Sequence, residues 1–115
     1  MKNLIFVLLI FSLVGCANHV PYTKRQKVSL AFNILANAAD VVTTEYALNK
    51  GAVEMNPIFG EKPEIGWLIS GKLLVIGFAY MCGEFYPEYR EWWHYGYGAI
   101  GGSCAVHNYG WIKDN

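Results

Sequence analysis

Residues 28–50 read VSLAFNILANAADVVTTEYALNK, and this stretch decides the fold. It contains no Gly or Pro, is rich in Ala and Leu, and is followed by Gly51, a residue type that commonly ends a helix in the left-handed conformation. Polar residues recur in it at spacings of four, three and four, at Asn33, Asn37, Asp40 and Thr44. Such spacings place side chains on one helical face, so the stretch predicts an amphipathic helix over residues 28–50.

Two apolar stretches follow a loop. Residues 51–63 contain Asn56-Pro57 and Lys62-Pro63, which disfavour regular structure. Residues 65–82 then carry one charge, and residues 92–112 carry no Asp, Glu, Lys or Arg. Both are long enough to cross or nearly cross a hydrocarbon layer, and the second has Trp and Tyr at both ends, as is typical of membrane interfaces. We therefore expect an all-α fold, a small bundle of three helices over about 28–50, 65–82 and 92–112, embedded in a membrane.

Composition agrees with one small membrane domain. The chain has 115 residues, of which 54% are hydrophobic and only 16% charged. A soluble, aromatic-rich bundle is the alternative. Nine Lys and Arg balance nine Asp and Glu, so no basic field would attract nucleic acid, and we expect no nucleic-acid partner.

The N-terminus has the architecture of a cleaved secretory signal peptide. Lys2 precedes an almost unbroken apolar run over residues 4–14, which is too short to span a bilayer. The run ends in Leu13-Val14-Gly15-Cys16, which resembles the lipobox of bacterial lipoproteins. The resemblance implies that residues 1–15 are removed and that Cys16, now the first residue, carries lipid, including an acyl chain such as palmitate. Several chains on one residue give a lasting membrane anchor.

The expected domain organisation follows from this cleavage. Residues 16–27 form a lipidated polar tether, and residues 28–115 form the three-helix domain. The three basic residues of the tether could meet anionic headgroups or could simply be solvated, and both alternatives stand. By resemblance, Ala17 after the lipidated cysteine permits export to the outer membrane of the cell envelope, whereas helical spans favour the inner membrane. We favour the inner membrane.

A face of small residues in the last stretch is a candidate packing surface. Gly98 and Gly102 lie four apart, and close packing of small residues is typical of membrane helices. The second stretch offers Gly66, Ser70 and Gly77 as the surface opposite. Alternatively, Gly98 and Gly102 could hold a membrane-protein partner or a second copy of the chain.

Charged and polar residues in these apolar stretches are the candidate site. An ionised side chain in lipid is costly unless it is paired, so Lys72 should pair with Asp40 or Glu54. We predict one interhelical cluster, comprising Asp40, Thr44, Glu54, Asn56, Lys72, His107 and Asn108. The cluster could fix helix register or form a functional site, and its ligand spacing gives little support for a metal site.

The order of these residues is similar to that of a known group of proteins. The pattern D-x-x-T-T from Asp40, then G-x-x-E-x-N-P from Gly51, then His107-Asn108, resembles a family of small multi-helix bacterial membrane proteins of unknown function. The resemblance covers residues 37–108 and implies a fold rather than an activity. The signal peptide is a departure from that family.

No catalytic motif accompanies the cluster. The sequence lacks a nucleophile elbow, a phosphate-binding glycine loop and a paired-cysteine redox motif, so enzyme activity has no positive support and no cofactor is expected. Cys82 and Cys104 are expected as free thiols, and His19 and His94 as solvated or interfacial residues. We predict a structural or interaction role. The alternatives are an intramembrane enzyme or ion-binding protein, and an envelope-modifying lipoprotein related to phage exclusion or lysis.

Overall fold

The computed structural model describes residues 3–8 and 19–115. Residues 3–8 are helical, and three long helices follow: α2 (Lys24–Asn49), α3 (Ile65–Phe85) and α4 (Arg90–Asp114), with the short 3₁₀ helix η1 (Pro87–Tyr89) between the last two. These described ranges contain no strand. The all-α prediction is therefore confirmed, as is the irregular loop before α3. The cysteine of the lipobox, Cys16, lies outside the described residues.

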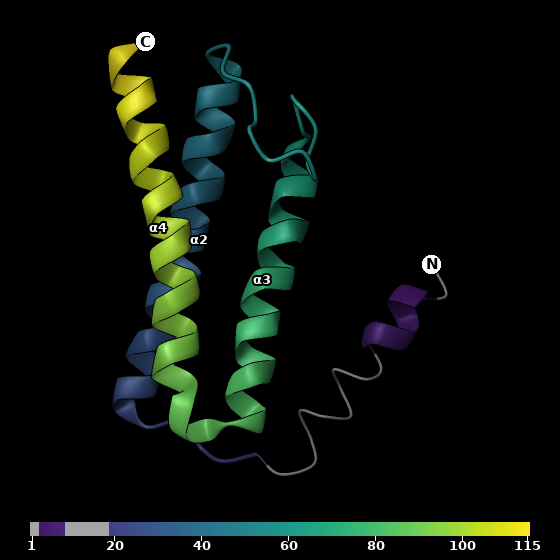
Figure 1. Cartoon of the computed structure of the whole chain (residues 1–115), viewed down its shortest axis with the longest axis vertical. Helices are drawn as coiled ribbons and strands as arrows, with labels where there is room; N and C mark the ends of the chain where they lie inside the picture. The colour runs from purple at the N-terminus through teal and green to yellow at the C-terminus, as the bar shows by residue number, and fades with distance from the viewer. Residues whose placement is uncertain (1–2, 9–18) are drawn as a thin grey trace.

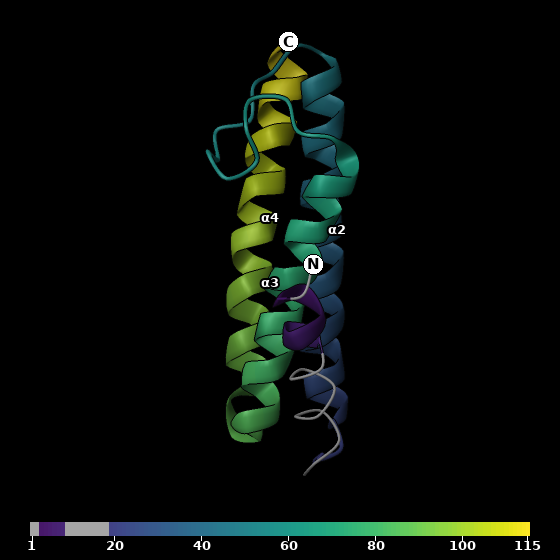
Figure 2. The ribbon, with the colours of Figure 1, turned by 90° about the vertical axis from the view of Figure 1, so that its right-hand side faces the viewer.

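The three long helices lie side by side and alternate in direction (Figure 1). Most contacts join α2 to α4, which lie against each other along their length, while α3 is packed less closely against both. The view turned by 90° shows the same close pair of α2 and α4 (Figure 2). The C-terminus lies at the same end of the bundle as the loop between α2 and α3, and η1 closes the opposite end. We call these the loop end and the η1 end.

Helix α2 begins earlier than the sequence analysis predicted. Thr23 and Gln26 form a capping box, in which Gln26 N donates to Thr23 Oγ1 (3.2 Å) and Thr23 N donates to Gln26 Oε1 (3.1 Å). This reciprocal pair satisfies two N–H groups that a helix start otherwise leaves free. The first turn of α2 therefore lies within the segment assigned to the tether, residues 16–27. The predicted end is accurate, since Gly51 has φ 102° immediately after α2.

The turn between α3 and α4 is shorter than predicted. Helix α3 continues to Phe85 instead of residue 82, and α4 begins at Arg90 instead of residue 92. Pro87 is the first residue of η1, where a backbone N–H would have no partner within the helix, so the absence of one costs nothing. The chain then turns from α3 into α4 within a few residues. Glu84 consequently lies in the last turn of α3, and Glu91 lies in the first turn of α4.

Helix α4 does not meet the expectation of a full membrane span. Among the helices of the described residues, α3 alone is long and apolar enough to cross a membrane by length and composition. The interior of α4 carries Gly, Tyr, His, Ser and Asn, which lower its hydropathy although it has no charge from residue 92 to residue 112. Absence of charge is a weaker criterion than apolar character.

The polarity of the bundle is inverted relative to that of a soluble domain. Its largest fully buried side chains are all polar: Arg90, His94, Asn33, Asn37 and Ser29. The apolar side chains on the outer faces are largely exposed, for example Leu35 (69%), Leu74 (63%) and Val106 (72%). Soluble domains bury Leu, Ile and Phe and expose polar side chains, so this distribution requires an explanation.

The small-residue face of α4 packs against α2, not against α3 as predicted. A Cβ added at Gly98 would lie 3.0 Å from the Asn33 Cα, and one added at Gly101 would lie 2.6 Å from the Asn37 Oδ1. Gly102 also faces α2, whereas Gly66 and Gly77 of α3 have no atom within 4 Å of such a Cβ. The face is thus occupied within the chain, because the Phe32 ring and the Asn33 backbone leave no room for a side chain at position 98, and the Asn37 amide leaves none at position 101.

Two alanine substitutions in α4 should change stability in opposite directions. Gly101→Ala is expected to lower the free energy of unfolding by about 1–3 kcal/mol, because its methyl group would overlap the buried Asn37 side chain. Gly96→Ala, with no atom within 4 Å, should raise it by about 0.5–1 kcal/mol through helix propensity. Thermal unfolding of the purified variants, followed by circular dichroism, measures both. Equal effects of the two substitutions would contradict the packing described above.

Candidate functional site

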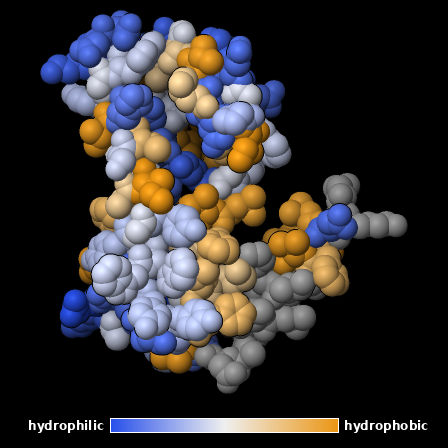
Figure 3. Space-filling model, viewed as in Figure 1, coloured by the Kyte–Doolittle hydropathy of each residue, from blue (hydrophilic) through white to orange (hydrophobic). Residues whose placement is uncertain are grey.

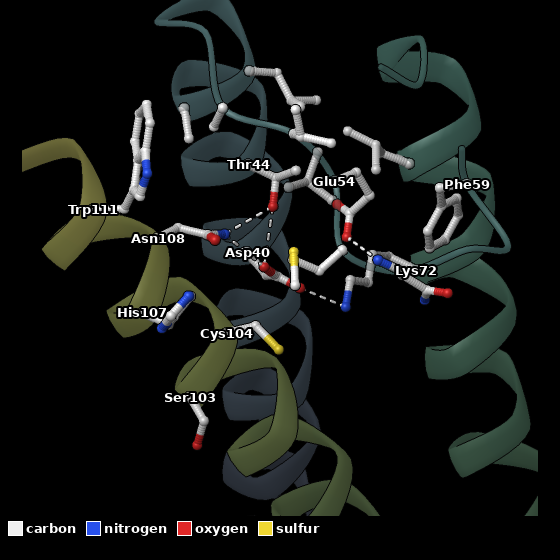
Figure 4. A pocket seen from close by; sticks show the side chains of 18 residues that line it. Asp40, Thr44, Glu54, Phe59, Lys72, Ser103, Cys104, His107, Asn108 and Trp111 are labelled. Carbon is white, nitrogen blue, oxygen red and sulfur yellow. Dashed lines mark hydrogen bonds and ion pairs between the residues drawn. The ribbon is translucent and has the colours of Figure 1, made fainter. Parts of the chain in front are cut away.

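Asp40 and Lys72 form a buried ion pair between α2 and α3. Lys72 Nζ lies 2.6 Å from Asp40 Oδ2, and the side chains are 22% and 7% exposed. This is one of the two pairings considered from the sequence. Asp40 points towards the core because it continues the polar stripe of α2, and Lys72 reaches it from the neighbouring helix (Figure 4).

Asn108 of α4 joins the same group from the third helix. Its Nδ2 lies 3.1 Å from Asp40 Oδ1, 3.1 Å from Thr43 Oγ1 and 2.8 Å from Thr44 Oγ1. Thr44 Oγ1 also donates to Asp40 Oδ1 at 3.3 Å. We call Asp40, Thr43, Thr44, Lys72 and Asn108 the Asp40 cluster. Because both carboxylate oxygens have partners, the cluster ties three helices together and leaves Asp40 poorly placed to act as a base.

The other predicted members of the cluster lie close by but do not bond to it. Glu54 Oε1 accepts from the backbone N–H of Asn56 at 2.9 Å, and Asn56 Oδ1 accepts from the backbone N–H of Ile58 at 3.1 Å. These are local bonds that shape the loop, so Asn56 acts as a turn residue. His107 is exposed on α4, one position before Asn108, and no hydrogen bond joins it to the described residues.

A cavity of about 670 Å³ lies between the helices at the loop end. Asp40, Lys72, Glu54, His107 and Asn108 line it together with Thr44, Asn56 and a larger number of apolar residues, among them Leu68, Phe59 and Trp111 (Figure 4). The space-filling view shows the hollow between α3 and the pair of α2 and α4, with hydrophilic residues at its floor (Figure 3). All predicted candidate residues from Asp40 to Asn108 therefore share one cavity, although only four of them belong to the Asp40 cluster.

A second polar group at the η1 end was missed by the sequence analysis. Arg90 is completely buried; its Nη2 lies 3.2 Å from Glu84 Oε1, and its Nε donates to Gly83 O at 3.1 Å. Nη1 lies 3.4 Å from Pro21 O and 3.3 Å from Gln26 Oε1. We call Arg90 and these partners the Arg90 cluster. The planar guanidinium of Arg90 carries enough N–H donors to bond to all of these acceptors at once, whereas the ammonium group of a lysine could not.

The segment before α2 is docked on the Arg90 cluster. His19 Nδ1 lies 3.0 Å from Glu84 Oε2, and the guanidinium of Arg90 lies 4.1 Å from the centroid of the Tyr22 ring. Burial raises the pKa of Tyr22 to about 12, against the opposing effect of Arg90, so its hydroxyl stays protonated. His19 is exposed, as predicted, but it also has an acidic partner in Glu84. His94 was predicted to lie at an interface and is instead fully buried.

The buried asparagines of α2 connect this region to the middle of the bundle. Asn37 Nδ2 donates to Asn33 Oδ1 (2.7 Å), and Asn33 Nδ2 lies 3.2 Å from His94 Nδ1. His94 Nε2 in turn lies 3.0 Å from the Tyr22 hydroxyl. The chain of bonds is consistent when His94 is neutral, accepts at Nδ1 and carries its proton on Nε2. This arrangement satisfies each side chain and fixes the register of α2 against α4.

Metal chemistry has no structural support in the described part of the chain. Within residues 3–8 and 19–115, no three His, Cys, Asp or Glu side chains lie close enough to hold a metal ion.

Comparisons with protein-family models, curated proteins and solved structures return no match. Function must therefore be inferred from the site itself.

Proposed function

We propose that this chain is a lipid-anchored membrane protein of the bacterial cell envelope with a structural or interaction role. In this proposal Cys16 carries the lipid, and the helices lie in the inner membrane. The Asp40 cluster and the Arg90 cluster act as internal ties that hold the helices in register. The inverted polarity of the bundle carries the proposal, since apolar outer faces around polar contacts are what a lipid environment favours.

Aqueous surroundings would give the same bundle little stability. Its exposed side chains include Ile34, Leu35, Val42, Leu73, Leu74 and Phe78, which in water would leave a large apolar surface uncovered. In lipid these side chains need no protein partner. The buried polar groups then supply interhelical hydrogen bonds, each of which contributes about 0.6–2 kcal/mol in membrane proteins.

The docked tether is compatible with a lipid anchor at the η1 end. His19 is the third residue after Cys16, and a chain spans at most about 3.6 Å per residue, so the anchor would lie within roughly 11 Å of the docked position. Trp92 and Tyr89 are exposed at this end, where interfacial aromatic side chains are favoured. The proposal places the η1 end at the outer surface of the membrane and the loop end at the cytoplasmic surface.

Fatty-acid labelling and fractionation of a Cys16→Ala variant test this proposal. We expect wild type alone to incorporate a labelled fatty acid, and both proteins to stay in inner-membrane vesicles after an alkaline carbonate wash. The variant should remain because the helices would hold it without lipid. Release of the variant by the wash would refute membrane embedding, and absence of label from wild type would refute the lipid anchor.

A further inference from the structure

The cavity at the loop end has a charge distribution that a purely structural role does not require. Asp40 is matched by Lys72, but Glu54 receives only the backbone N–H of Asn56, and no Lys or Arg of the described residues lies within ion-pair distance of it. Among the described residues, the Asp, Glu, Lys and Arg side chains of the lining are thus two carboxylates and one ammonium group, and the second carboxylate, that of Glu54, has no cationic partner. We propose that the cavity binds a small amphiphilic amine, with its ammonium group at Glu54 and its aliphatic part along the apolar wall.

The size and lining of the cavity fit such a ligand. A volume of about 670 Å³ lies within the range of about 300–1,000 Å³ that is usual for small-molecule sites. Most of the lining is apolar, and Val53, Phe59 and Leu68 belong to this wall. A few convergent polar groups in an apolar pocket orient a ligand by one end, and the carboxylate of Glu54 would accept charge-assisted hydrogen bonds from an ammonium group.

An anionic amphiphile fits the same cavity less well. Within residues 3–8 and 19–115, Lys72 supplies the only ammonium group in the lining, and its Nζ already lies 2.6 Å from Asp40 Oδ2. A fatty-acid carboxylate would have to displace this buried pair and would also meet the carboxylate of Glu54. Repulsion between the fatty-acid carboxylate and the carboxylate of Glu54 would disfavour binding. The direction of selectivity is therefore amine over alcohol, and alcohol over carboxylate.

Binding of three eight-carbon probes to the purified full-length protein tests the proposal. Octylamine, octanol and octanoate share one chain and differ in head-group charge, and titration calorimetry in a non-ionic detergent reports their affinities. We expect saturable binding of octylamine that is at least about tenfold tighter than that of octanoate, because only the amine can form a charge-assisted hydrogen bond with the Glu54 carboxylate. Equal or tighter binding of octanoate would overturn the proposal.

Variants then locate the bound amine. Glu54→Gln should weaken octylamine binding by about tenfold or more, and Glu88→Gln, on an exposed residue at the η1 end, should leave it unchanged. Val53→Trp keeps every charge and should block the cavity. Octylamine binding that survives either Glu54→Gln or Val53→Trp would place the ligand elsewhere. None of these outcomes depends on lipidation or on membrane insertion, so the two proposals can fail separately.

Discussion

Replacing Arg90 with methionine is expected to lower the free energy of unfolding by about 3–5 kcal/mol. The substitution removes a fully buried cation and leaves the Glu84 carboxylate, whose side chain is 6% exposed, with His19 as its remaining partner. Loss of one member of a buried ion pair costs this much because the remaining buried charge loses its permanent opposite charge and gains no hydration in exchange. The carbonyls of Gly83 and Pro21 would lose donors as well.

The docked segment gives this prediction a second readout. Because Arg90 contacts Pro21 and the Tyr22 ring, Arg90→Met should release the residues before α2 and loosen the first turn of the helix. Lys24 and Arg25 are exposed in the wild type already, so limited trypsin digestion after them should become faster. Arg90→Lys keeps the charge but not the planar fork, so its stability should be intermediate. Thermal melts and a digestion time course on the same samples measure both effects. Wild-type stability of Arg90→Met would show that Arg90 does not hold this end together.

Lys72→Met is expected to cause a loss of similar size at the other end of the bundle. The variant would leave the Asp40 carboxylate, 7% exposed, with hydrogen bonds from Thr44 and Asn108 but no opposite charge. We expect the free energy of unfolding to fall by about 3–5 kcal/mol, measured by chemical denaturation. Membrane abundance should fall in parallel.

A double variant distinguishes loss of charge balance from loss of packing. Asp40→Asn combined with Lys72→Met removes both charges and keeps an amide that can still bond to Asn108. Most of the stability lost in the single variant should therefore return, since paired charges can be replaced by neutral groups at little cost. If the double variant is as unstable as Lys72→Met alone, the ion pair is not the tie between α2 and α3.

The stripe of polar residues in residues 28–50 predicted much of the fold correctly. Asn33, Asn37, Asp40 and Thr44 do lie on one face of α2, and Gly51 does end the helix. The spacing of side chains along a single helix is a local property, so the sequence can specify it. The need to pair Lys72 followed from the cost of burying a charge, which is also independent of the detailed fold.

The partner of each face was harder to predict. The small face of α4 was assigned to α3, yet it packs on α2, where Phe32 and Asn37 leave no room for a side chain larger than that of glycine at positions 98 and 101. One signal for this was present: Arg90, His94, Gly98, Gly101, Ala105 and Asn108 recur every three or four residues, matching the polar stripe of α2. Two stripes with the same helical spacing indicate a helix pair.

The Arg90 cluster was missed because Arg90 bonds to residues that are distant in the sequence. Pro21 is 69 residues from Arg90, and Gln26 is 64 residues from it. Each residue alone had a plain explanation as part of a tether, a turn or an interface. The capping box of Thr23 and Gln26 was the local feature that could have shown that α2 begins before residue 28.

The central claim is that the apolar outer faces of the bundle meet lipid, and cysteine accessibility at Leu74 tests it most directly. Leu74 on α3 and Ile58 in the loop are 63% and 78% exposed, so water would reach both if the bundle were soluble. Each residue is replaced by cysteine, one at a time, in a variant that also carries Cys82→Ser and Cys104→Ser. Permeabilised membranes that contain the variant are then treated with a charged maleimide. The account predicts rapid labelling at position 58 and labelling at position 74 only after detergent is added. Equally rapid labelling at both positions before detergent would contradict it.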